Sequence, residues 1–124
     1  MIPLAPILAG SGFLLAAAAA DTLPNTDVKP TCRAAIEMMG SQGRTIESCM
    51  ASETAAREEI VKGWAQVPKE EKTRCLQTAL HSGSPSYVEL LICIEMHRDS
   101  RTRQQQVKDD QAKAKAAKTP AAKP

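Results

Sequence analysis

The chain contains four cysteines, and they begin and end two segments that have nearly the same pattern of residues. The first segment, from Cys32 to Cys49, is CRAAIEMMGSQGRTIESC, and the second, from Cys75 to Cys93, is CLQTALHSGSPSYVELLIC. Both begin with Cys-x7-Gly, and in both a short group of helix breakers separates two stretches of helix formers. Each segment therefore predicts a helix, a tight turn and a second helix.

The rise of an α-helix, about 1.5 Å per residue, sets the distance of each cysteine from its turn. Cys75 and Cys93 would each lie about 12 Å from their turn, and Cys32 and Cys49 about 12 and 9 Å from theirs. Cys49 and Cys75, by contrast, would lie about 27 and 11 Å from a turn at residues 67–68. This register favours the pairs Cys32–Cys49 and Cys75–Cys93, while pairings that cross between the hairpins stay open.

Residues 1–20, MIPLAPILAGSGFLLAAAAA, carry no charge and end in small residues, a pattern typical of a cleaved signal peptide. The alternative is an uncleaved membrane anchor, because about 20 apolar residues can cross a bilayer. An even number of cysteines behind an export signal indicates disulfides, since oxidising compartments form and keep them. We expect cleavage after Ala20 and a periplasmic or secreted protein, with membrane contact only if the segment stays uncleaved.

The remaining chain is divided into a linker at residues 21–30, a disulfide-stapled helical domain at 31–103 and a tail at 104–124. The tail is rich in Lys, Ala and Pro and has almost nothing to bury, so we expect it to be disordered, although its Ala/Lys part can continue a helix transiently. The predicted fold class is all-α. It is a small disulfide-stapled bundle of about four helices, built from two helical hairpins, with a disordered C-terminal tail.

Apolar residues recur at three- and four-residue steps between Thr45 and Val67, which predicts a long helix with Thr45 as its cap. Glu53 and Arg57 interrupt this stripe at i,i+4. We interpret them as an ion pair on the helix surface, and the alternative is a polar feature that faces a partner.

The stretch from Tyr87 to Met96 is apolar nearly all round, which predicts a central buried helix. Ser84 or Ser86 can cap this helix at its start, the latter with Glu89 three residues on. The glycine before it, Gly83, is expected to adopt a left-handed backbone at the end of the preceding helix.

Three blocks of the sequence carry a resemblance to a known group of proteins. They are the run from Ser48 to Arg57, then Trp64, then the run from Pro85 to Met96, and their pattern is CM-x2-E-x2-AR…W…PSYVELL-x-C-x-EM. The chain resembles, over about residues 32–99, an uncharacterised family of small exported helical proteins of alphaproteobacteria of the rhizobial kind. Ile92 departs from the pattern, where threonine is expected. The resemblance implies export and a cysteine-containing helical fold. It does not identify any catalytic or binding residue in this chain.

Metal chemistry has few candidate ligands in this sequence. His97 lies at i+4 from Cys93, a spacing that can hold a metal, but a bridged Cys93 offers no thiolate, and we set zinc aside. Copper handling through Met and His ligands is the alternative function, although methionines at helical spacing are more often core filler. The second histidine, His81, is expected at a helix end, where it complements the helix dipole. The ligands considered for copper are Met38, Met39, Met50, Met96 and His97.

Several classes of function have no support in the sequence. The formal net charge is +2, and outside the N-terminal stretch only Trp64 and Tyr87 can stack on bases, which argues against nucleic acid. No nucleophile elbow, phosphate loop, HExxH motif or CxxC motif is present. We therefore expect a non-catalytic structural or binding module, without cofactor or metal, whose partner is an unknown protein or the cell envelope.

Overall fold

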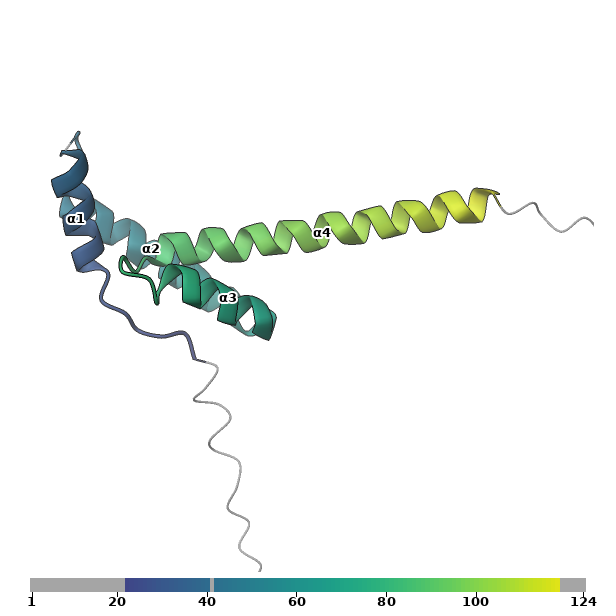
Figure 1. Cartoon of the computed structure of the whole chain (residues 1–124), viewed down its shortest axis with the longest axis horizontal. Helices are drawn as coiled ribbons and strands as arrows, with labels where there is room; N and C mark the ends of the chain where they lie inside the picture. Colours follow the sequence, from purple (N-terminus) through teal and green to yellow (C-terminus); the bar gives the residue numbers. More distant parts are fainter. Residues whose placement is uncertain (1–21, 41, 119–124) are drawn as a thin grey trace, which may run out of the picture.

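The computed structural model describes residues 22–40 and 42–118, which form four α-helices and one short 3-10 helix (Figure 1). The described part of the chain contains no strand, so the prediction of an all-α fold with about four helices is confirmed. In chain order the elements are α1 (Lys29–Met39), α2 (Ile46–Gly63), η1 (Trp64–Gln66), α3 (Lys69–Ala79) and α4 (Tyr87–Lys118).

Two disulfides staple the helices in pairs. Cys32 is bonded to Cys49, which joins α1 to α2, and Cys75 is bonded to Cys93, which joins α3 to α4; in both pairs the Cα atoms lie 5.7 Å apart. The pairing predicted from the helix register is confirmed. The bonded state of all four cysteines indicates an oxidising compartment outside the cytoplasm.

The first part of α4 lies at the centre of the packing. It contacts both α2 and α3, whereas α1 packs on α2 and on no other described helix. Leu90 and Cys75 are completely buried in this core, and Trp64 closes it at the end of α2. Lys72 is also buried, and its ammonium lies 4.9 Å from the centre of the Trp64 ring, where the ring face attracts the charge.

The segment before α1 belongs to this core. Leu23 and Val28 are both buried among the residues of α2, α3 and α4, although the segment forms no helix. The expected linker at residues 21–30 is therefore wrong for the described residues from 22 onward. The free energy gained when these two apolar side chains are buried exceeds the conformational entropy that the short segment loses when it is ordered.

Caps and glycines set the ends of the hairpin elements. Thr45 caps α2 as predicted: its Oγ1 accepts from the N–H of Ser48, and the Ser48 hydroxyl oxygen accepts from the N–H of Thr45, both at 3.0 Å. Gly40 and Gly43 take the left-handed backbone in the α1–α2 turn, with φ of 69° and 80°. Gly83 does not, so the prediction for Gly83 is wrong. It lies in the open loop beyond the end of α3, where an added Cβ would meet nothing within 4 Å.

The stretch expected to be buried all round is buried on one face only. Leu90 and Ile94 point into the core, while Ile92 is 49% exposed and Met96 is 66% exposed. One side of α4 covers α2 and α3, and the other side faces solvent along its whole length. A four-helix body of this size has no further layer to cover that second face.

The helix α4 continues far beyond the body, as Figure 1 shows. It runs without a break to Lys118, so the expected boundary at residue 103 lies inside a helix and the expectation of disorder is wrong for residues 104–118. Ala, Gln and Lys are strong helix formers, and Gln105 donates to the Asp109 carboxylate one turn on at 2.9 Å. Residues 119–124 lie outside the described residues, as do residues 1–20.

Candidate functional site

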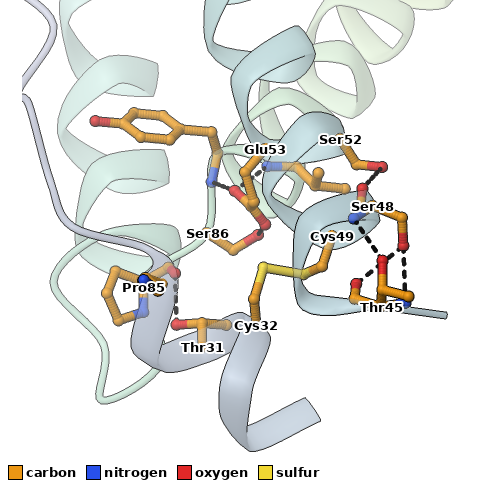
Figure 2. The surroundings of a disulfide bond; sticks show 12 residues. Thr31, Cys32, Thr45, Ser48, Cys49, Ser52, Glu53, Pro85 and Ser86 are labelled. Atoms are coloured by element: carbon orange, nitrogen blue, oxygen red, sulfur yellow. Dashed lines mark hydrogen bonds between the residues drawn. A yellow bond between two sulfur atoms is a disulfide. The ribbon is translucent and has the colours of Figure 1, made fainter. Parts of the chain in front are cut away.

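The most unusual polar residue of the body is Glu53, which is only 4% exposed. It lies in the middle of α2, and its carboxylate points toward Ser86, which directly precedes α4 (Figure 2). Its Oε1 accepts from the Ser86 hydroxyl at 2.7 Å, and its Oε2 accepts from the backbone N–H of Tyr87 at 2.6 Å and of Val88 at 3.3 Å. Glu53 therefore does not form the predicted ion pair on the helix surface.

Glu53 and Ser86 together satisfy the start of α4. The first N–H groups of a helix have no partner within the helix, and a negative charge is favourable next to them. Glu53 takes the first two, and the Ser86 oxygen accepts from the N–H of Glu89 at 3.2 Å. Of the two caps predicted from sequence, Ser86 is confirmed, but its own N–H donates to the carbonyl oxygen of Ala79 at 2.9 Å and not to the Glu89 side chain. We call Glu53, Ser86 and Tyr87 the α4 cap.

The α4 cap also holds the rest of the body together. The Tyr87 hydroxyl donates to the carbonyl oxygen of Pro24 and accepts from the N–H of Thr26, both at 2.7 Å, and thereby fixes the segment before α1. The Thr31 hydroxyl of α1 donates to the carbonyl oxygen of Pro85 at 2.7 Å. Segments more than 50 residues apart in the chain therefore meet at one helix start.

Arg57 lies one turn after Glu53 and has a different environment. Its guanidinium carbon lies 5.7 Å from the centre of the Tyr87 ring, and its Nε is buried without a hydrogen-bond partner in the described part of the chain. It borders a hollow of about 190 Å³ that Asn25, Asp27 and Tyr87 also line. Polar side chains form part of the lining of this hollow, so water that enters it has polar partners.

The α4 cap is a structural feature by its chemistry. Both carboxylate oxygens of Glu53 already accept hydrogen bonds, three in total, from donors that are fixed within the body.

The second polar cluster surrounds the Cys75–Cys93 disulfide. His97 lies one helical turn after Cys93, and an imidazole nitrogen and the two sulfur atoms all lie within 4.8 Å of one another. Cys75 is completely buried, whereas Cys93 and His97 are partly exposed. The sequence indicated the spacing of Cys93 and His97, but not that Cys75 of another helix completes the group.

Among the described methionines, Met50 packs against the core, as the sequence favoured, whereas Met38, Met39 and Met96 are exposed. Met38 and Met39 end α1, which does not contact α4, where Met96 and His97 lie. The copper alternative therefore has no gathered Met/His ligand set in the described part of the chain. His81, exposed just after α3, is placed at a helix end as expected.

Comparison with known protein families, with curated proteins and with solved structures finds no match. Within residues 22–40 and 42–118, no helix combines the length and the apolar character needed to cross a membrane.

Proposed function

We propose that the chain is an exported, non-catalytic helical module that binds a protein or a cell-envelope surface. The segment of α4 from residue 101 to 118, which we call the α4 arm, is the part that binds. The observation that carries the proposal is that every residue of this arm is exposed although the helix is continuous with the body. At about 1.5 Å per residue the arm extends about 27 Å.

A lone helix of this length is marginal in water, and packing usually supplies most of the stability of a helix. At the start of the arm, Arg101 forms an ion pair with Glu71 of α3, which ties this part of α4 to the body. Beyond this pair, the exposed helix offers a long surface to a partner. Because the body already holds the first turns of α4, less conformational entropy is lost when the arm is ordered on binding.

The charge of the α4 arm suggests the kind of surface that it meets. The arm carries six basic residues and two acidic ones, Asp109 and Asp110. Two of the basic residues, Lys108 and Lys115, are seven positions apart and so share one side of the helix. A partner with negative charge on its surface, whether a protein or the envelope, is complementary to this side.

Site-specific photo-crosslinking in the producing cell tests the proposal. A photoreactive residue at Val107 of the arm, which is 53% exposed, is expected to give a discrete adduct. The matched control is Val61 on α2, which is 51% exposed and lies on the body. We expect no adduct from position 61, and we expect excess unlabelled chain to compete with the adduct from position 107.

A chain that ends after Arg103 supplies the second control. Because the arm beyond Arg103 is exposed at every described residue, this truncation is expected to leave the melting temperature within about 3 °C of the full chain, and it should fail as a competitor. Equal adducts from both positions, no adduct from position 107, or competition by the truncated chain would each contradict the proposal.

Export is the other part of the proposal, and the composition of residues 1–20 together with the two disulfides supports it. We expect the intact mass of the protein from the periplasm or the medium to correspond to a chain that begins at Asp21. An intact Met1 in a membrane fraction would indicate the anchor instead.

A further inference from the structure

The Cys75–Cys93 disulfide differs from the Cys32–Cys49 disulfide in its surroundings. In the described part of the chain, the group of His and Cys side chains close enough to share one ion is Cys75, Cys93 and His97. Among the described residues, no third His, Cys, Asp or Glu side chain lies as close to Cys32 and Cys49. Two sulfurs and an imidazole nitrogen from adjacent helices are a ligand set that Zn²⁺ uses when its fourth position stays open.

Solvent reaches this cluster of Cys75, Cys93 and His97 from one side only. Cys75 is sealed in the core, while Cys93 and His97 are partly exposed on α4, so a reductant or an ion reaches the group from the α4 side. The histidine is one turn from Cys93 on the same helix, and its position therefore depends little on the bond between the sulfurs.

We propose that this cluster is a redox-gated binding site for a thiophilic divalent ion of the Zn²⁺ kind. A dithiol reductant attacks the accessible Cys93 sulfur and breaks the bond to Cys75, which leaves as a thiolate. The second thiol of the reductant then displaces Cys93, so the protein disulfide gains two electrons and the dithiol becomes a disulfide. The ion binds the two thiolates and the neutral His97 imidazole, with release of the thiol protons.

The geometry needs only a local change. Two sulfurs bound to one tetrahedral ion at about 2.3 Å lie about 3.8 Å apart, further than two sulfurs joined by a bond of about 2.05 Å. The 4.8 Å span of the three ligand atoms is already close to this arrangement. Rotation of the cysteine side chains about χ1 supplies such a shift, with the two helices kept in contact.

The test is a titration of the mature chain, reduced with a water-soluble phosphine, desalted without oxygen and kept in the cold, because loss of the disulfides is expected to prevent folding only at higher temperature. Co²⁺, a spectroscopic substitute for Zn²⁺, is expected to bind one per chain with thiolate-to-metal charge-transfer and tetrahedral ligand-field absorption. Zn²⁺ should displace the Co²⁺ and raise the melting temperature of the reduced chain, followed by circular dichroism, since the ion binds the folded state. The oxidised chain should bind neither ion.

Three variants separate this site from adventitious thiol binding. Cys32→Ser/Cys49→Ser should keep one Co²⁺ per chain, and Cys75→Ser/Cys93→Ser should lose it. His97→Gln should alter the ligand-field bands and weaken binding by at least about tenfold, as even second-shell partners are worth about 10- to 100-fold. No binding by the reduced chain, equal binding by the oxidised chain, or an unchanged spectrum and affinity for His97→Gln would each overturn the proposal.

Discussion

Replacing Glu53 with alanine is expected to lower the free energy of unfolding by about 3 kcal/mol, a large part of the stability of so small a body. The change removes the acceptor for the Ser86 hydroxyl and for two backbone N–H groups at the start of α4. Buried donors without partners cost about 1–3 kcal/mol each, and water from the hollow beside Arg57 recovers part of the loss. Urea unfolding of the oxidised protein measures the difference.

Two further variants identify the cause of this loss. Glu53→Gln keeps the shape and one carbonyl oxygen for the backbone N–H groups, so we expect it to cost about 1–2 kcal/mol, for the lost charge at the helix start. Glu58→Ala changes an exposed carboxylate on the same helix and should stay within about 0.5 kcal/mol. If Glu53→Ala were as mild as Glu58→Ala, the α4 cap would not stabilise the body.

Removal of the Cys75–Cys93 disulfide by Cys75→Ala/Cys93→Ala is the second change with a large expected effect. We expect a loss of about 2–5 kcal/mol in the free energy of global unfolding, because the bond closes a loop of 18 residues and anchors α3 to α4 inside the core. For a small exported domain, such a loss is often enough to prevent folding near 37 °C.

The matched change is Cys32→Ala/Cys49→Ala, which opens a loop of nearly equal length, 17 residues. The only buried residue of α1 is Cys32, and α1 packs on α2 alone among the described helices. We therefore expect α1 to unfold locally, seen as fast amide hydrogen exchange at residues 33–39, with a smaller loss in global stability. Equal global losses and a protected α1 would show that α1 belongs to the cooperative core.

The disulfide pairing was accessible from the sequence because it depends on local geometry. Helical rise is nearly constant, so counting residues from a turn converts sequence positions into levels along a hairpin. The caps at Thr45 and Ser86 were accessible for the same reason, since a cap and its target lie three residues apart.

The role of Glu53 was not accessible because it depends on which helix end lies above α2. A polar residue within an apolar stripe fits a surface ion pair and a buried cap equally well until that contact is known. The burial of Leu23 and Val28 was not predicted for a related reason. A short segment without a helical pattern does not indicate which part of the core it covers. The burial predicted for Met96 was wrong because the composition of a helix does not indicate how many of its sides are covered by other helices.

Because α4 is one continuous helix, the direction in which a side chain points at its far end is fixed relative to the end that packs in the core. No glycine or proline occurs from Tyr87 to Lys118, and sharp kinks arise almost only at such residues or at helical bulges. The core therefore sets the direction in which Lys108 faces, several turns away. A single residue inserted after Arg103 would turn everything distal to it by about 100°, while four would restore the original facing to within about 40°. The body thus acts as the angular reference for whatever the distal helix meets.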